Sequence, residues 1–239
     1  MCEHYVARAA EPFRLAELWV FTEQLERYGI AGFGWGASWI SSAGRIESHR
    51  DIGAFRDDAA RDAVGAVETT AALVHLRRPS KLSTLGIADT QPFDDPAGRF
   101  SFSHNGDFRK VQAWRAKFRA AGRIHGRADT EVGARWLEDA WDGAAAGPPG
   151  VLATLHETLG GQANLSLLTA DGGVSAYAGN TENPVFTFRL GRIGIASTGI
   201  NSLDRSIFRF AAPGATERQL VRVGGTVALN RQGGAIPTA

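Results

Sequence analysis

The chain begins Met1-Cys2-Glu3-His4-Tyr5, and Cys2 is its only cysteine. If Met1 is removed, Cys2 carries a thiol and a free α-amine on one residue. An α-amine has an unperturbed pKa of about 7.7–8.0, so part of it is neutral near pH 7 and can accept a proton. A thiol beside such a base is an activated nucleophile. This stretch predicts an N-terminal nucleophile; the alternative is a chance cysteine in a disordered terminus.

The composition is that of an ordinary globular protein. The chain has 239 residues, 44% of them hydrophobic, and a formal net charge of +1. This length favours a single domain over residues 1–239, and the charge argues against nucleic acid or an anionic membrane as a partner. A lone cysteine excludes an internal disulfide and a multi-cysteine metal site. Glu3, Arg8 and Glu11 interrupt any apolar signal core, so we expect a cytoplasmic protein.

Hydrophobic periodicity predicts both helices and strands. Helices are predicted at residues 15–27, 57–70, 108–118 and 132–141. Strands are predicted at 31–40, 71–76, 99–103, 165–169, 174–177, 185–190, 193–197 and 220–229. This order favours a layered α+β architecture over a doubly wound fold. Residues 143–150 are interpreted as a loop and residues 232–239 as a loose tail.

Four short patterns punctuate the predicted strand ends. They are His75–Ser80 (HLRRPS), Ser103–Asp107 (SHNGD), Ala128–Glu131 (ADTE) and the glycine-rich Gly32–Gly36 (GFGWG). With Met1-Cys2, their order and spacing resemble the class II glutamine amidotransferase domain of the N-terminal-nucleophile hydrolases, especially its small stand-alone members. The resemblance covers about the first two hundred residues, and five motifs together are far more specific than one. It implies a four-layer αββα sandwich.

Asn105 and Gly106 are the candidates for stabilising a tetrahedral oxyanion. Asn105 offers a side-chain N–H, and Gly106 offers a main-chain N–H that is not hindered by a side chain. One such donor is worth about 2.7–4 kcal/mol in a transition state. The structural alternative for Asn-Gly is a type I′ hairpin turn.

Arg77 and Asp129 are the candidates for holding the two charged groups of a glutamyl α-carbon. The planar guanidinium of arginine matches a carboxylate bidentately, and the resemblance selects Arg77 rather than Arg78 for this role. The alternative for Arg77 is a surface ion pair. Asp129 would receive the α-ammonium, and it is also well placed to cap the helix that follows.

Three further residues, Trp35, Gly36 and His104, are substrate-binding candidates. The Gly34-Trp35-Gly36 strand is expected to line the pocket, and His104 flanks the proposed site. A histidine after an apolar strand is also typical of a hydrogen-bonded structural group, which is the alternative for His104 and His75. No HExxH-type pattern or dinucleotide-binding turn occurs, so neither a metal nor a cofactor is predicted.

Residues 77–81 depart from the family pattern on the amide side of the site. Pro79 replaces a small residue, and Arg78 stands where the larger synthetase-fused enzymes carry a tryptophan. Ser80 and Lys81 replace a threonine and a histidine of those enzymes. The motifs for the nucleophile, the oxyanion and the zwitterion are retained.

The resemblance implies a glutaminase or amidotransferase that passes ammonia from glutamine to a separate synthetase or acceptor-binding protein. One alternative is an amide hydrolase that acts on a γ-glutamyl conjugate. Another is a catalytically silent domain that binds glutamine. The acceptor, the partner, the pathway and the oligomeric state are not encoded in these motifs.

The basic segment Phe108–Arg127 has seven Arg or Lys residues and no acid, which is typical of a solvated helix face.

Overall fold

The computed structural model describes residues 2–79, 81–141, 147–200 and 209–238. One sheet contains β1 (Glu3–Arg14), β2 (Trp35–Ile40), β3 (Ile46–Asp51), β4 (Glu68–Leu76), β9 (Val185–Leu190), β10 (Ile193–Thr198) and β11 (Ala215–Leu220). The other contains β5 (Phe93–Asp94), β6 (Phe100–Phe108), β7 (Gly161–Thr169), β8 (Val174–Tyr177), β12 (Thr226–Leu229) and β13 (Ala235–Thr238). The α-helices are α1 (Trp19–Gly29), α2 (Arg61–Gly65), α3 (Gln112–Ala120), α4 (Asp129–Ala140) and α5 (Gly147–Leu159). Short 3₁₀ turns are η1 (Leu15–Leu18), η2 (Phe55–Asp57), η3 (Leu82–Thr84) and η4 (Ile87–Asp89).

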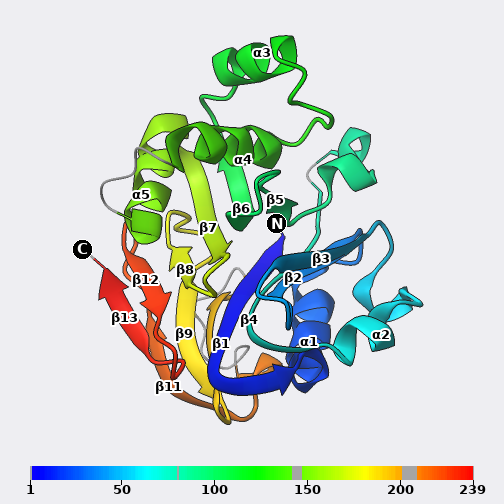
Figure 1. The fold of residues 1–239 in the computed structure, drawn as a ribbon, viewed down its shortest axis with the longest axis vertical. Coiled ribbons are helices and arrows are strands. Elements are labelled where there is room, and N and C mark those ends of the chain that lie inside the picture. Colours follow the sequence, from blue (N-terminus) through cyan, green and yellow to red (C-terminus); the bar gives the residue numbers. More distant parts are fainter. Residues whose placement is uncertain (1, 80, 142–146, 201–208, 239) are drawn as a thin grey trace.

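The two sheets lie face to face, and helices cover their outer faces (Figure 1). The strand orders are β11-β9-β10-β1-β4-β2-β3 and β13-β12-β8-β7-β6-β5, and every pair is antiparallel. Helix α1 packs on the first sheet, whereas α4 and α5 pack on the second. This is the four-layer αββα sandwich that the sequence motifs predict.

Alternating side chains along each strand produce the layers. On β1, Tyr5 and Ala7 pack in the core beneath α1, while Val6 faces the other sheet. Val6 and Leu73 meet Leu168 and Ala176 in the core between the sheets. Successive side chains of a strand point to opposite faces, so a central strand contributes to two cores.

The predicted strands at 174–177 and 185–190 agree with β8 and β9. The first strand, β1, is absent from the sequence prediction. Its residues include many alanine, glutamate and arginine side chains, which have little intrinsic preference for strands. Pairing with β4 on one side and β10 on the other overrides that weak preference.

The predicted helix over 57–70 is wrong for most of its length. Only Arg61–Gly65 is α-helical, and β4 begins at Glu68, where the chain pairs with Arg14. The β-branched Thr69 and Thr70 suit a strand, and pairing with β1 decides the conformation.

The prediction of a loose tail at 232–239 is also wrong over Ala235–Thr238. This segment forms β13 and pairs with β12. The predicted strand over 220–229 splits into the end of β11 and β12, with a turn at Gly224-Gly225 between them. The predicted loop over 143–150 is partly replaced by α5, and its first four residues lie outside the described residues.

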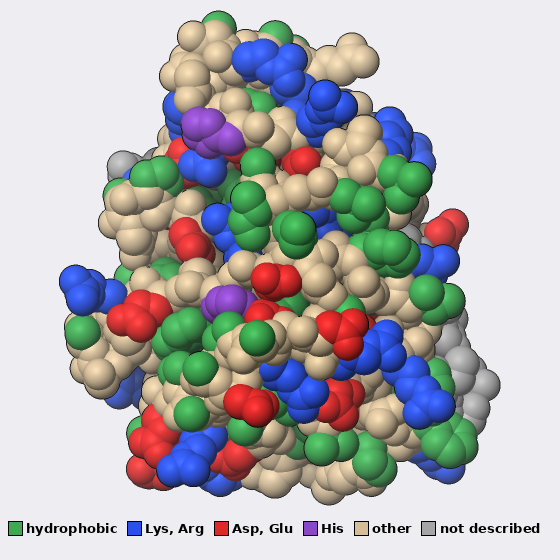
Figure 2. All heavy atoms as spheres, turned by 90° about the vertical axis from the view of Figure 1, so that its right-hand side faces the viewer, with side chains coloured by type: hydrophobic (Ala, Val, Ile, Leu, Met, Phe, Trp, Pro, Cys, Tyr) green, Lys and Arg blue, Asp and Glu red, His purple; other side chains and the backbone are tan. Residues whose placement is uncertain are grey.

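The basic segment forms α3 and its flanks. Figure 2 shows Lys and Arg side chains gathered at the upper end of the molecule, where Figure 1 places α3. Lys117 and Arg123 pair with Asp139 at 2.9 and 2.7 Å, so acids of α4 neutralise part of this surface. Across the described ranges, no helix combines the length and the apolar character needed to cross a lipid bilayer.

Candidate active site

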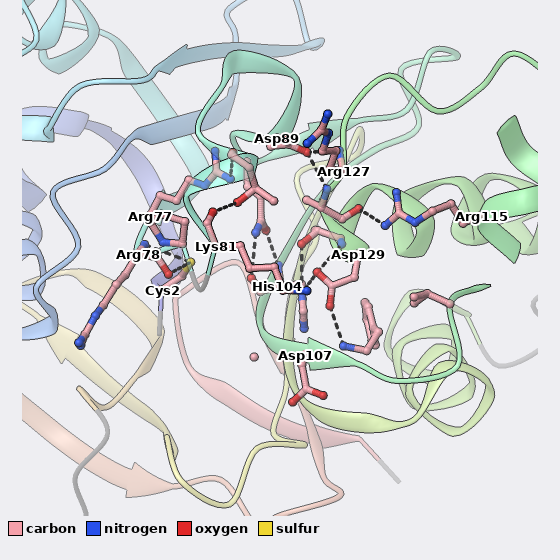
Figure 3. Close-up of a pocket in the computed structure, with 18 residues that line it drawn as sticks. Cys2, Arg77, Arg78, Lys81, Asp89, His104, Asp107, Arg115, Arg127 and Asp129 are labelled. Atoms are coloured by element: carbon pink, nitrogen blue, oxygen red, sulfur yellow. Dashed lines mark hydrogen bonds and ion pairs between the residues drawn. The ribbon is translucent and has the colours of Figure 1, made fainter. Parts of the chain in front are cut away.

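A cleft of about 850 Å³ opens where β1 begins and β4 ends (Figure 3). Five of the eight candidate residues line it: Cys2, Arg77, His104, Gly106 and Asp129. The antiparallel register places Glu3 opposite Leu76, so Cys2 and Arg77 lie at the same edge of the sheet. His104 and Gly106 come from β6 of the other sheet, and Asp129 begins α4. These five residues therefore come from both sheets and from α4, and the rest of the lining includes Arg115 of α3.

The thiol of Cys2 lies against the main chain of Arg78. The Arg78 N–H donates to Cys2 Sγ at 3.3 Å, and Sγ lies 3.6 Å from the Arg78 carbonyl oxygen. Burial raises the pKa of the Cys2 thiol, although the Arg78 N–H and the Arg77 guanidinium oppose part of that effect. The resting thiol is therefore protonated near neutral pH, and it needs a base to become a nucleophile. Met1, whose removal would free the α-amine of Cys2, lies outside the described residues.

Arg77 is a buried cation, with only 4% of its surface exposed. Its guanidinium donates to the carbonyl oxygens of Thr84 and Gly86 and to Thr90 Oγ1. No carboxylate of the described residues forms an ion pair with it, so the surface ion pair is excluded there. A buried cation held only by neutral acceptors is well suited to receive an anionic group of a ligand.

Asp129 supplies a carboxylate at the opposite wall. Its Oδ2 accepts the Phe108 N–H at 2.7 Å, and its Oδ1 accepts the Thr130 N–H at 3.0 Å. The second contact is to the next residue along the chain. The N-cap of α4 is Ala128, without a side-chain cap, so the prediction that Asp129 caps this helix is wrong. The side chain is 29% exposed, so the same carboxylate can also meet a ligand. Of the two roles predicted for Asp129, only contact with a ligand remains open.

His104 is buried between Asp129 and the aromatic ring of Phe108. Its Nδ1 lies 3.1 Å from Thr130 Oγ1 and 4.0 Å from Asp129 Oδ1, and its ring stacks on Phe108 at 4.2 Å. Burial lowers the pKa of His104, so the ring is neutral at neutral pH. Its Nε2 has no hydrogen-bond partner among the described residues. His104 thus fits the structural role that the sequence offers as the alternative, and it also lines the cleft.

Asn105 and Gly106 lie within β6, opposite Asn164 and Ala163 of β7, so the alternative of a hairpin turn is wrong. Gly106 has φ +123°, and a Cβ there would lie 1.7 Å from the Gln162 carbonyl oxygen, so only glycine fits. Asn105 is fully buried beside the cleft rather than on its surface. Its Nδ2 donates to the Cys2 carbonyl oxygen.

Trp35 and Gly36 do not line the cleft, contrary to the sequence prediction. Trp35 is fully buried on the opposite face of the sheet, where it packs edge-on against Trp19 and Phe55. Gly36 lies against the main chain of Gln91, and a Cβ at Gly36 would lie 2.4 Å from the Gln91 carbonyl oxygen. The glycine allows the main chain of Gln91 to approach the sheet closely.

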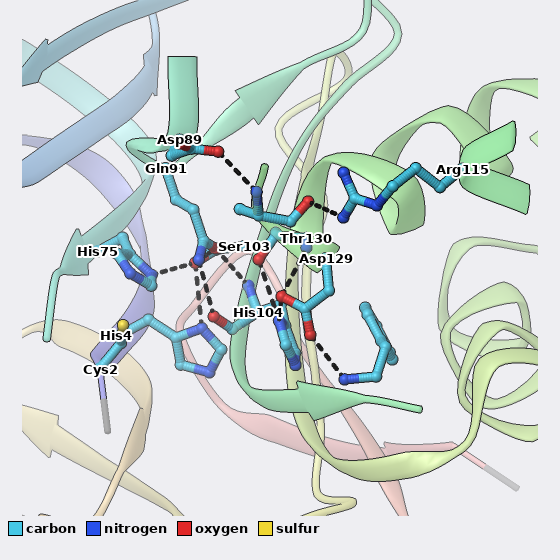
Figure 4. A network of polar contacts seen from close by, with 12 residues as sticks. Cys2, His4, His75, Asp89, Gln91, Ser103, His104, Arg115, Asp129 and Thr130 are labelled. Carbon is cyan, nitrogen blue, oxygen red and sulfur yellow. Dashed lines mark hydrogen bonds and ion pairs between the residues drawn. The ribbon is translucent and has the colours of Figure 1, made fainter. Parts of the chain in front are cut away.

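A buried polar network beneath the cleft is absent from the sequence prediction (Figure 4). Ser103 Oγ lies 2.6 Å from His75 Nδ1 and 3.2 Å from His4 Nδ1, and it donates to Gln91 Oε1 at 3.1 Å. Gln91 accepts the His104 N–H at 2.7 Å and donates to the His104 carbonyl oxygen at 3.1 Å. The Gln91 side chain thus satisfies main-chain groups of β6 one residue before Asn105.

The histidines of this network are neutral. Burial lowers the pKa of His4 to about 3 and holds the pKa of His75 well below its usual value. No spacing in the sequence points to the network, because His4 and His75 reach Ser103 from the other sheet and Gln91 reaches it from the loop before β5. Within the described ranges, no three His, Cys, Asp or Glu side chains form a group that could hold a metal ion.

No family model and no curated protein sequence matches the chain. Solved structures do resemble it. Glutamine phosphoribosylpyrophosphate amidotransferase from B. subtilis matches with a TM-score of 0.73 and 16% identity, over 99% of this chain and 49% of that one. A structure described as the allosteric regulatory enzyme of purine biosynthesis gives 0.72 and 14%, over 99% and 48%.

A third structure, a glutamine aminotransferase class-II domain protein from Silicibacter pomeroyi, matches with a TM-score of 0.59 and 18% identity, over 98% of both chains. The chain spans about half the length of the first two structures. The predicted resemblance in fold is thereby confirmed: the αββα fold of this chain is shared with these glutamine amidotransferase structures.

Proposed function

We propose that the chain hydrolyses the side-chain amide of glutamine through a thioester on Cys2. The neutral α-amine of mature Cys2 takes the thiol proton as Sγ adds to the amide carbon. The same amine passes the proton to the leaving nitrogen, and ammonia departs. Water then attacks the thioester, which releases glutamate and restores the thiol. The raised pKa of the partly buried thiol is the reason that the nucleophile needs this base.

The observation that carries the proposal is the arrangement of charges around Cys2. Arg77 presents a buried guanidinium without an ion pair among the described residues, and Asp129 presents a partly exposed carboxylate in the same cleft. A glutamyl α-carbon carries one carboxylate and one ammonium, so this pair matches it in charge. Holding that end fixes the amide relative to Cys2.

Gly106 and Asn105 would stabilise the oxyanion. Gly106 lines the cleft with no side chain in the way. Asn105 Nδ2 uses one hydrogen on the Cys2 carbonyl oxygen, and its second hydrogen remains to be donated. Loss of one such donor typically costs about 10²–10³-fold in kcat.

Two points of the proposal concern the wider reaction. The ammonia would serve an acceptor that is bound by a separate synthetase or acceptor-binding protein. A γ-glutamyl conjugate is the alternative substrate, because the proposed contacts of Arg77 and Asp129 are the same for any γ-glutamyl amide. Rates of hydrolysis for glutamine and for γ-glutamyl conjugates, measured on the same preparation, separate the two.

The test is covalent labelling with a diazo-ketone analogue of glutamine, followed by peptide mapping and intact-mass measurement. We expect one label on Cys2, a mass without Met1, and no label in Cys2→Ser. Excess glutamine should protect Cys2. Retention of Met1 together with an unlabelled Cys2 would instead support a silent glutamine-binding domain and contradict the proposal.

A further inference from the structure

The cleft carries more positive charge than glutamine needs. Its lining includes the cations Arg77, Arg78, Lys81, Arg115 and Arg127. Within the described residues, none of these five forms an ion pair. Neighbouring cations of the basic segment do pair, for example Lys117 with Asp139 at 2.9 Å. Lys110 and Arg119 of the same segment also have no ion pair among the described residues, so what distinguishes the five cations is that they line one cavity.

The three acids of the lining do not balance these cations. Asp89 Oδ1 accepts the main-chain N–H groups of Arg127 and Ala128 at 2.5 and 2.6 Å. Asp107 pairs with Arg109 at 3.5 Å. Asp129 is the carboxylate proposed for the substrate ammonium. The cleft thus has a positive field that favours anionic ligands.

Two consecutive arginines flank the nucleophile. Cys2 Sγ contacts the main chain of Arg78, and Figure 3 shows the side chains of Arg77 and Arg78 diverging from it. Arg77 turns into the cleft, where its guanidinium is held by the segment Thr84–Thr90. Arg78 is exposed at the mouth of the cleft. If Arg77 holds the glutamyl end, Arg78 lies beside the nitrogen that leaves.

On the basis of the proposed function, we infer that the preferred substrate is a γ-glutamyl amide whose amine half carries an acidic group, bound by Arg78 and Lys81. Arg77 and Asp129 account for both charged groups of the glutamyl half. A second anion can therefore lie only on the amine half. The cleft volume of about 850 Å³ is in the range that holds a ligand much larger than one amino acid. Ammonia alone would leave these cations without a partner.

The test compares two substrates that differ in one charge, γ-glutamylglycine and γ-glutamylglycinamide, with glutamine as a third. We expect the wild-type protein to favour the acid over the neutral amide by about tenfold or more in kcat/KM, as for one charge-assisted contact. The preference should decrease as salt is added, because Arg78 and Lys81 are exposed.

Variants of Arg78 show whether this side chain carries the preference. Arg78→Gln should reduce the acid-to-amide ratio toward one. Arg78→Glu should favour a γ-glutamyl diaminobutane, whose amine half is cationic. Arg119→Gln is the matched control, because Arg119 is exposed on α3 and does not line the cleft. It should keep the wild-type ratio.

Two outcomes overturn the inference in distinguishable ways. If glutamine is hydrolysed but the acid and the amide react equally well, or Arg78→Gln keeps the full preference, the subsite is wrong and the proposed function remains. If no γ-glutamyl compound reacts and Cys2 is not labelled by the diazo-ketone, the proposed function fails and the subsite fails with it.

Discussion

Asn164 Nδ2 donates a hydrogen bond to Asn105 Oδ1 at 3.1 Å, across the β6–β7 pair. This contact fixes which end of the Asn105 carboxamide faces Cys2, because the oxygen is occupied and Nδ2 is left to donate to the Cys2 carbonyl oxygen. Asn164 is fully buried and does not line the cleft. It would therefore position the proposed oxyanion donor without touching the substrate.

Asn183 and Asn180 also donate to Asn105 Oδ1, at 3.4 and 3.5 Å, so Asn164 is the shortest of three donors. We expect Asn164→Asp to lower kcat by about 10–100-fold with little change in KM, because it replaces that donor by a carboxylate oxygen that repels Asn105 Oδ1. Steady-state kinetics with glutamine measure both constants. Asn230→Asp, in the turn between β12 and β13, is the matched control, and its bond from the Gly234 N–H survives the change. A rise in KM alone would contradict the positioning role.

Gln91 is the second positioning residue. Its side chain makes two hydrogen bonds with the main chain of His104, beyond the point where β5 stops pairing with β6. Gln91→Met keeps the volume but leaves the buried His104 N–H without its acceptor. We expect a loss of about 1–3 kcal/mol in the free energy of unfolding and a lower kcat.

Urea unfolding and glutamine kinetics test the Gln91 prediction together. Gln112→Met, at the exposed start of α3, should change neither. If Gln91→Met lowers stability but leaves kcat intact, then Gln91 supports the fold without positioning β6 for catalysis.

The contrast between predicted and unpredicted site residues follows from how each is placed. Cys2, Arg77, Gly106 and Asp129 lie where an element begins or ends, or close to its end, so local motifs predict that they share an edge. Asn164 and Gln91 act through contacts with β6 from other segments of the chain, which no local spacing encodes. A single sequence therefore shows the residues that line the cleft better than those that hold them in place.

Trp35 illustrates the opposite error. The glycines of the Gly34-Trp35-Gly36 strand predict that another segment packs closely against it. They do not determine which side chains of the strand point to the cleft. The register decides this: Trp35 lies opposite Leu76, and both belong to the core beneath α1. A shift of one residue would have exchanged the two faces.

Because Trp35 belongs to that core, its substitution should affect stability rather than substrate binding. We expect Trp35→Ala to lower the free energy of unfolding by about 3–5 kcal/mol. Trp35→Phe should cost less, although it loses the bond from Nε1 to Asp58 Oδ2 at 2.9 Å. The folded Trp35→Phe protein should keep the KM of the wild type for glutamine. A large increase in that KM would show that the indole reaches the substrate after all.

Glu3 makes stability depend on pH. Its carboxyl group is fully buried beside Asn183 and Thr198, and burial raises its pKa from 4.5 to about 7 despite the hydrogen bonds from these two side chains. Between these two values the folded state binds more protons than the unfolded state, so the contribution of Glu3 to stability falls as the pH rises. The shift corresponds to a loss on the order of 3 kcal/mol by pH 8.

Glu3→Gln removes this titration and keeps an acceptor for Asn183. The buried histidines act in the opposite direction below their usual pKa, so the difference between the two proteins, rather than the wild-type curve, isolates Glu3. Unfolding free energies at pH 5 and pH 8 should show the variant gaining on the wild type as the pH rises. The exposed Glu47→Gln should follow the wild type at both values. Parallel curves for Glu3→Gln and the wild type would mean that the Glu3 carboxyl is not held protonated by the fold.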